Sequence, residues 1–146
     1  MRIVTLADTG ATAHLVTETS VAPQPSPSGD GWGWIDATDD EGSFAVVGLW
    51  GRDGYDLGCW PYIVFALAQY PTEAGFTAFG YATYVEGDLA AHWYSTEEAR
   101  NLAVSKEAWW YWCSGQSDGP RELQGLDPDA FEPRDGLCEP FAGFGC

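Results

Sequence analysis

Short β-prone runs separated by turn residues dominate the first two thirds of the chain. Arg2 to Ala7 and Ala13 to Thr19 flank the turn-type residues Asp8-Thr9-Gly10, so they predict a first hairpin. Gly33 to Ala37 and Ser43 to Trp50 predict two further strands joined by an acidic turn. The pattern therefore indicates an antiparallel meander.

Between these strands, the segment from Val21 to Gly31 contains Pro23, Pro25 and Pro27. Proline cannot donate a hydrogen bond to a strand ladder and favours extended backbone. We therefore expect a surface loop over residues 21–31.

Two central segments have the strongest strand signals. Pro61 to Tyr70 is almost continuously apolar, which predicts a strand buried on both faces at the centre of the sheet. Phe79 to Val85 alternates large side chains with Gly80, Ala82 and Tyr84, so one face should carry the large residues. Leu89 to Tyr94 is expected to form the next strand.

One helix is predicted, from Thr96 to about Trp112. Ser95 and Glu98 have the spacing of a capping box, which would place the Ser95 hydroxyl at the first amides of the helix. The polar positions expected to face water are Arg100, Asn101 and Glu107. The stripe expected to lie on the sheet is Ala99, Leu102, Ala103, Trp109, Trp110 and Cys113.

Four consecutive aromatic residues end this helix, from Trp109 to Trp112. Successive helical residues are 100° apart, so at most two of the four rings can enter one buried stripe. At least one large ring must point toward another surface.

The fold class predicted is α+β: an antiparallel meander sheet of about six strands with one main helix, residues 96–112, packed on a face. Residues 1–115 should form a single domain, and residues 116–146 an irregular acidic tail. The tail should either wrap the domain, through Leu123, Leu126, Phe131 and Phe141, or be partly disordered.

Charge and aromatic content change this picture by restricting the partners. The 146 residues carry a formal net charge of -16, with 22 acidic against six basic side chains and eight Trp. An aromatic fraction of 15% indicates a folded chain, because disordered acidic chains are poor in aromatics. Direct nucleic-acid binding is disfavoured, since phosphate neutralisation needs clustered Lys and Arg.

An acidic protein can instead imitate DNA. Spread over about 7,300 Å² of surface, this charge gives about one net charge per 460 Å², whereas a duplex has about one phosphate per 110 Å². A DNA mimic would therefore need its acids clustered on one face.

Cellular location and thiol chemistry follow from what the sequence lacks. No apolar run approaches the length needed to cross a bilayer, and no export signal is recognisable at the N-terminus, so we expect a cytoplasmic protein without membrane contact. The thiols are then expected to be reduced, although an even set can form two disulfides in three pairings. They are Cys59, Cys113, Cys138 and Cys146.

Catalytic signals are weak. His14 and His92 lie on predicted strands, and His92 should face away from Trp93. Residues 36–42 resemble a calcium loop, but the turn glycine is misplaced and Val47 stands where a bidentate Glu is required. Nothing in the sequence predicts a cofactor or a metal site.

Surplus aromatics offer the second partner signal, because Trp and Tyr are enriched at binding hot spots. Trp32 and Trp34 follow the proline-rich loop and are flanked by glycines. The candidate partner-binding residues are Trp32, Trp34, Asp36, Asp39, Asp40, Glu41, Trp109 and Trp112.

The favoured function is non-enzymatic binding of a protein partner, basic or DNA-binding in character, through an acidic surface with aromatic anchors. The scarcity of Lys and Ile indicates GC-rich codons, so a phage-encoded inhibitor or accessory protein, acting in the host cytoplasm, would fit. Two alternatives stay open: a small hydrolase or transferase with a Cys/His/acid site, and a structural, self-assembling protein of the virion type, which would form a homo-oligomer.

Overall fold

A computed structural model describes the following parts of the chain: residues 2–16, 34–36, 43–45, 47–50, 64–85, 88–114, 125–131 and 140–141. The strands are β1 (Arg2–Thr5), β2 (Thr12–Leu15), β3 (Trp34–Asp36), β4 (Ser43–Ala45), β5 (Gly48–Trp50), β6 (Val64–Pro71), β7 (Thr77–Val85), β8 (Asp88–Tyr94) and β9 (Pro140–Phe141), and the helix is α1 (Glu97–Ser114).

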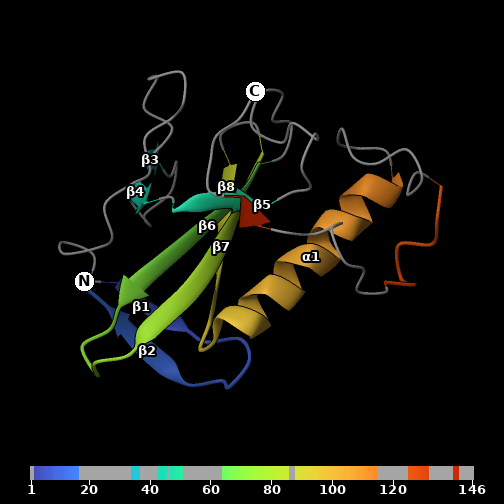
Figure 1. Cartoon of the computed structure of the whole chain (residues 1–146). Coiled ribbons are helices and arrows are strands. Elements are labelled where there is room, and N and C mark those ends of the chain that lie inside the picture. Colours follow the sequence, from blue (N-terminus) through green and yellow to red (C-terminus); the bar gives the residue numbers. More distant parts are fainter. Residues whose placement is uncertain are drawn as a thin grey trace.

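The largest sheet has the strand order β8-β7-β6-β5-β9, with every neighbouring pair antiparallel (Figure 1). Strands β5 to β8 follow one another as the expected meander, and the α+β class is confirmed. The described sheet has five strands instead of about six. The predicted strand over residues 43–50 is split at a bend at Val47: β4 pairs with β3, whereas β5 pairs with β6.

Strand β6 lies at the centre of this sheet, as its apolar sequence predicts. Consecutive residues Phe65, Ala66, Leu67 and Ala68 are all buried. Phe65 and Leu67 belong to a cluster that includes helix residues, whereas Ala66 and Ala68 belong to a second cluster with the N-terminal hairpin. Both faces of the strand are therefore covered.

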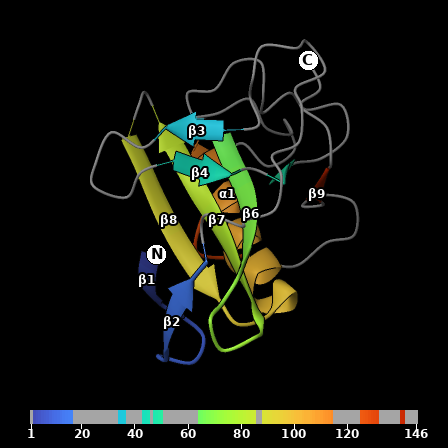
Figure 2. The same cartoon turned by 90° about the vertical axis from the view of Figure 1, so that its left-hand side faces the viewer.

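The N-terminal hairpin, β1–β2, forms as predicted and covers the face with small residues. One edge of the hairpin bridges Leu6 to Trp93 at the end of β8, and the other bridges Leu15 to Thr72 just after β6. Seen from the side, the hairpin lies at one end of β6, β7 and β8 (Figure 2). The two bridges thus join β1, β2, β6, β7 and β8 into a closed ring at that end of the sheet.

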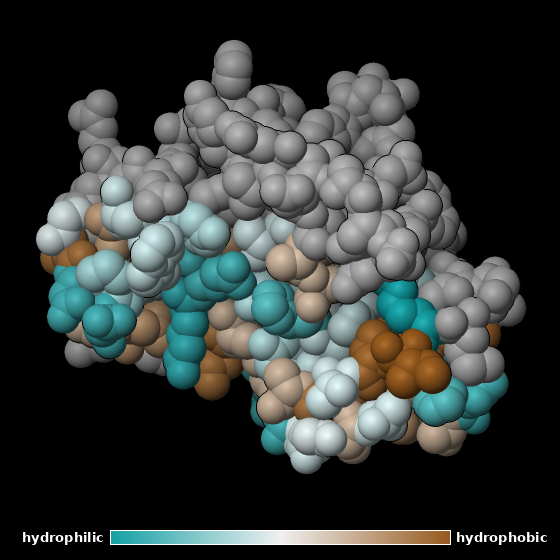
Figure 3. All heavy atoms as spheres, turned by 180° about the vertical axis from the view of Figure 1, so that it is seen from behind, coloured by the Kyte–Doolittle hydropathy of each residue, from teal (hydrophilic) through white to brown (hydrophobic). Residues whose placement is uncertain are grey.

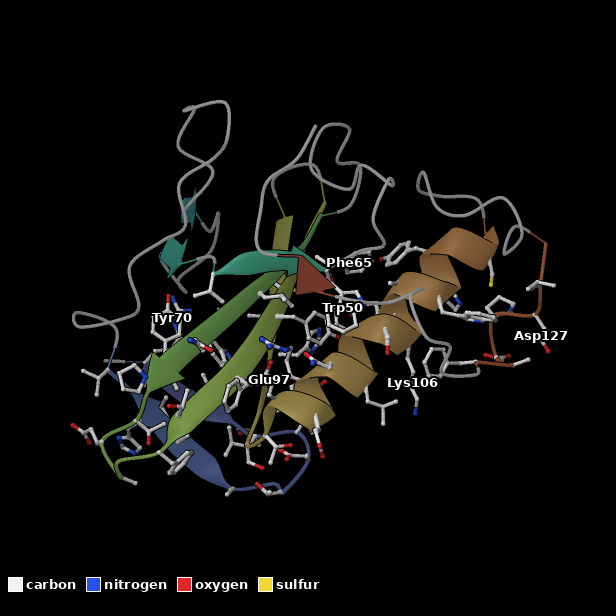
Figure 4. The ribbon with its side chains drawn as sticks, in the orientation of Figure 1. Trp50, Phe65, Tyr70, Glu97, Lys106 and Asp127 are labelled. Carbon is white, nitrogen blue, oxygen red and sulfur yellow. The ribbon has the colours of Figure 1, made fainter. Side chains whose placement is uncertain are left out.

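Helix α1 packs on the opposite face. Trp50 and Phe65 lie between the sheet and the helix, whereas Tyr70 lies away from the helix (Figure 4). The buried cluster on this side includes Tyr81 from β7 and Val104 and Ala108 from α1.

The helix begins at Glu97, one residue later than predicted, and its cap is shifted by the same amount. The Thr96 hydroxyl, and not that of Ser95, accepts the Ala99 amide at 3.1 Å, which makes Thr96 the N-cap. Ser95 instead donates from its amide and its hydroxyl to the carboxylate of Asp8, and the amide bond is 2.9 Å long. The capping-box prediction is wrong because the carboxylate of Asp8, in the turn after β1, accepts the hydrogen bond of the Ser95 hydroxyl.

Two described parts of the C-terminal region contact the domain. The Gly125 amide donates to the carbonyl of Cys113 at the end of α1. Strand β9 pairs with β5, with Phe141 opposite Leu49. The division at residue 115 stays a prediction, and the loop at residues 21–31 and Leu123 lie outside the described residues.

Candidate functional site

Four of the eight candidate partner-binding residues from the sequence lie outside the described residues: Trp32, Asp39, Asp40 and Glu41. Trp34 and Asp36 form the two ends of β3, where their backbones pair with Ala45 and Ser43 of β4. The structure describes no side chain at these two positions, so the acidic hairpin stays a prediction.

The aromatic run at the end of α1 divides between different surroundings, as helix geometry requires. Trp109 is 2% exposed, its Nε1–H donates to the Asp127 carbonyl at 3.3 Å, and Phe131 packs edge-on against it. Trp110 is 42% exposed. Tyr111 is half-buried, and the side chain of Trp112 lies outside the described residues.

Trp109 is therefore a core residue, because the segment 125–131 covers it, and Trp110 is the exposed ring. The apolar stripe predicted from the sequence is wrong at Trp110 and also at Leu102, which is 46% exposed.

These two residues belong to a row of exposed side chains spaced four residues apart, which we call the outer ridge: Glu98, Leu102, Lys106, Trp110 and Ser114. Lys106 points away from the sheet (Figure 4). Seen from behind, hydrophobic surface interrupts the hydrophilic surface on the side of α1 and again on the side of the hairpin (Figure 3). Leu102 and Trp110 lie about 12 Å apart along the axis, at 1.5 Å per residue.

A polar cluster lies between α1 and β7, where the sequence pattern places solvent-facing residues. The Glu107 carboxylate accepts a hydrogen bond from the Tyr81 hydroxyl at 2.5 Å and one from the Thr83 hydroxyl at 2.8 Å. The prediction that Glu107 faces water is wrong: its carboxylate ties the helix to the sheet and is half-buried.

Three tyrosines near Glu107 resist ionisation. Burial, followed by the hydrogen bond to Glu107 and the charge of that residue, raises the pKa of Tyr81 far above its usual value. Burial also raises the pKa of Tyr94 and of Tyr111, and the charge of Glu107 acts in the same direction on both. These hydroxyls therefore stay protonated near neutral pH.

Arg100 also contradicts the prediction that it faces water, since only 3% of it is exposed. Its Nη1 donates to the carbonyls of Ala68 and Gly80 on neighbouring strands, at 3.3 and 3.1 Å. Its Nε donates to the Asn101 side chain, and its guanidinium lies 5.8 Å from the centre of the Phe79 ring. Burial lowers its pKa, while Glu97 acts in the opposite direction.

Neither histidine lies in a catalytic arrangement of described residues. His92 is exposed while Trp93 is buried, which confirms the predicted parity, and its ring lies 5.0 Å from that of Tyr81. His14 lies 3.7 Å from Glu73 in an exposed pair. Cys113 is buried, and the other cysteines lie outside the described residues.

The described part of the chain lacks two features that would suggest a function. It holds no group of three or more His, Cys, Asp or Glu side chains placed to bind a metal ion. None of its helices combines the length and the apolar character needed to cross a membrane.

Comparison with known proteins gives no relative: no protein-family model matches this sequence, and neither a curated protein nor a solved structure matches it significantly.

Sequence reasoning missed Arg100, Glu107 and Trp110 as residues of interest. Arg100 and Glu107 were expected to face water because they are charged. Trp110 was expected in the core because it is aromatic. A usable signal was present for Glu107, because the facing strand carries two hydroxyls at alternate positions, Tyr81 and Thr83.

Proposed function

We propose that this protein acts by binding another protein with a basic surface, and that the outer ridge of α1 is part of the contact. The observation that carries the proposal is the exposure of Trp110 and Leu102 on one row of the helix. Large apolar side chains that stay exposed on a rigid element are the usual anchors of protein interfaces.

The ring of Trp110 is held in position by its neighbour. It meets Tyr111 edge-on, with the ring centres 5.1 Å apart and the planes at 89°. Tyr111 in turn contacts Phe65 of β6, at 5.9 Å between ring centres. An anchor fixed in this way loses little conformational freedom on binding, which favours affinity.

The charge of the chain supports a basic partner over a second copy. Each copy carries a formal charge of -16, so two copies repel each other, and a basic surface is attracted. A phage-encoded inhibitor that captures a basic or DNA-binding host protein would have this character. Enzymatic function has less support, because the two hydrogen bonds of Glu107 give the polar cluster a structural role in joining helix and sheet.

The test is affinity capture from bacterial lysates with the protein and two matched variants. The double variant Leu102→Ala with Trp110→Ala removes both anchors, while Ile3→Ala removes an apolar residue of the N-terminal hairpin that is even more exposed, at 66%. We expect a basic protein that is retained by the parent chain and by Ile3→Ala, lost with the double variant, and released by rising salt.

Retention by all three proteins would contradict the role of the ridge. A partner of acidic character would contradict the electrostatic part of the proposal. Light scattering on the purified protein completes the test, because a dimer that the double variant dissociates would assign the ridge to a second copy.

A further inference from the structure

We propose that the flank of α1 formed by Glu107, Trp110 and Tyr111 receives a cationic side chain of the partner, a guanidinium in preference to an ammonium. We call this set the cation flank. The inference rests on the proposed function, since it names the chemical group through which the partner would be recognised.

Glu107 is the acidic member of the cation flank. Its two oxygens are bonded to the hydroxyls of Tyr81 and Thr83, which are dipoles and carry no positive charge. Among the described residues, the ion pairs are those of His14 with Glu73 and of Arg100 with Glu97, and neither includes Glu107. A half-buried carboxylate without a counter-ion is unfavourable, and a cation supplied by a partner would compensate it.

Two aromatic residues follow Glu107 on the helix. Trp110 and Tyr111 follow Glu107 by three and four positions, so all three side chains lie on one side of the helix, with Cβ atoms about 5–6 Å apart. Trp110 is 42% exposed, which leaves part of its ring open to solvent. A cation over such a ring and close to a carboxylate gains from both groups.

Among the described residues, the two basic side chains of α1, Arg100 and Lys106, form no ion pair with Glu107. Lys106 lies one turn before Trp110 on the outer ridge and points away from the sheet (Figure 4), and Arg100 is engaged by two backbone carbonyls. On the β8 side the titratable groups are His92, which is exposed, and Tyr94, which is half-buried. The flank therefore presents one permanent negative charge to an incoming group.

A guanidinium suits the flank better than an ammonium. It is planar and stacks on an aromatic face, and its remaining N–H groups can reach carboxylate oxygens at the same time. An ammonium keeps more of its hydration and offers no plane for stacking.

The experiment is a titration followed by NMR at constant ionic strength, with Nα-acetylarginine methylamide as the probe. The lysine analogue and the neutral citrulline analogue are the comparison compounds. The signal is the indole N–H of Trp110, which is assigned by its disappearance in Trp110→Phe. We expect a saturable shift with the arginine compound, weaker binding of the lysine compound, and no shift with citrulline.

Two variants locate the binding. Glu107→Gln should weaken arginine binding by about tenfold or more, whereas Glu98→Gln, which removes one exposed charge from the same helix, should change it less than about twofold. Equal effects of the two variants, or equal binding of arginine and citrulline, would overturn the inference.

Folding is checked by circular dichroism. Gln keeps an oxygen that can accept from one of the two hydroxyls. If Glu107→Gln nevertheless fails to fold, Trp110→Leu serves in its place, because this residue is exposed, and unchanged arginine binding, read from the Tyr111 signals, overturns the inference.

The two proposals can fail separately. Protein capture that depends on Leu102 and Trp110 but is unchanged in Glu107→Gln would leave the proposed function standing and would reject the cation flank. Arginine binding at the flank without any captured protein would do the reverse.

Discussion

The two faces of the central sheet are covered in different ways. The hairpin face is built from small residues, Ala66, Ala68, Ala78 and Ala82, and is filled by rings such as Trp93. The helix face carries large residues and includes polar side chains that reach from α1 into the sheet. The stability of the hairpin face therefore depends on close packing. The stability of the helix face depends on hydrogen bonds as well as on packing.

This difference predicts where each face is vulnerable. A face of small residues fails when volume is added, because nothing can move aside. A face with buried polar groups fails when one member of a hydrogen-bonded pair is lost, because the other is left without a partner.

The largest effect is expected from adding volume to the hairpin face at Gly80. A Cβ atom at this position would lie 2.6 Å from ring carbons of Trp93, so Gly80→Ala should lower the free energy of unfolding by about 2–3 kcal/mol. Urea denaturation measures the loss.

Combining Gly80→Ala with Trp93→Leu tests the cause. The smaller side chain makes room for the new methyl group, so the two changes should be coupled by about 1 kcal/mol or more. Strictly additive losses would show that Gly80 matters for another reason.

The next effect is expected from the helix face at Arg100. Arg100→Met keeps the length of the side chain but removes the donors to the carbonyls of Ala68 and Gly80, so we expect a loss of about 1–2 kcal/mol by urea denaturation.

Glu97→Gln is the matched control for the ion pair of Arg100. Its carboxylate is 3.9 Å from the guanidinium and is 60% exposed, so its removal should cost less than about 0.5 kcal/mol. A larger loss from Glu97→Gln than from Arg100→Met would assign the stability to the ion pair.

The third effect is a pH dependence of stability that arises from Tyr81 on the helix face. Burial raises the pKa of Tyr81 above its unfolded value of about 10, so the neutral hydroxyl contributes stability below that pH. Stability should be lost as the pH rises past about 10, and this decline should be shallower in Tyr81→Phe.

Thr83→Val provides the control for that slope. It removes the other hydrogen bond to Glu107 without removing a titrating group, so it should lower stability at neutral pH by about 1 kcal/mol and leave the alkaline slope unchanged. Denaturation midpoints between neutral and alkaline pH distinguish the two variants.

The smallest effect is expected where the hairpin meets the start of the helix. Burial alone would raise the pKa of Asp8, but the hydrogen bonds from Ser95 and from the backbone of Asp8 and Thr9 together outweigh it and lower the pKa. The carboxylate thus contributes stability above its unfolded pKa of about 3.9, which is lost as the pH falls below that value.

Asp8→Asn should therefore be slightly less stable than the parent chain at neutral pH, and the two should converge in acid. Melting temperatures measured from neutral pH to acid test this expectation, with Asp129→Asn, an exposed change, as the reference. Curves that stay parallel in acid would contradict it.

The sequence pattern predicted well those features that depend on residues close together in the chain. The apolar run around Phe65 required burial on both faces, and the alternation from Phe79 to Val85 required two different faces. The spacing from Trp109 to Trp112 required that one ring stay out of the core, and Trp110 is exposed.

What the sequence did not predict depends on residues far apart in the chain. Arg100 and Glu107 are buried or half-buried because strands opposite them supply acceptors and hydroxyl donors. Ser95 does not cap the helix because Asp8, 87 positions earlier, binds it. Trp109 is covered by residues 125–131, which no periodicity within the helix could reveal.

The two bridges that close the strand ring also impose an order of events during synthesis. Leu6 and Leu15 form their bridges with Trp93 and Thr72, which are synthesised much later. At roughly 5–20 residues per second, the hairpin waits roughly 4–16 s for β8. A two-stranded hairpin is marginal on its own. The hairpin is thus made before its partners but becomes stable only after them.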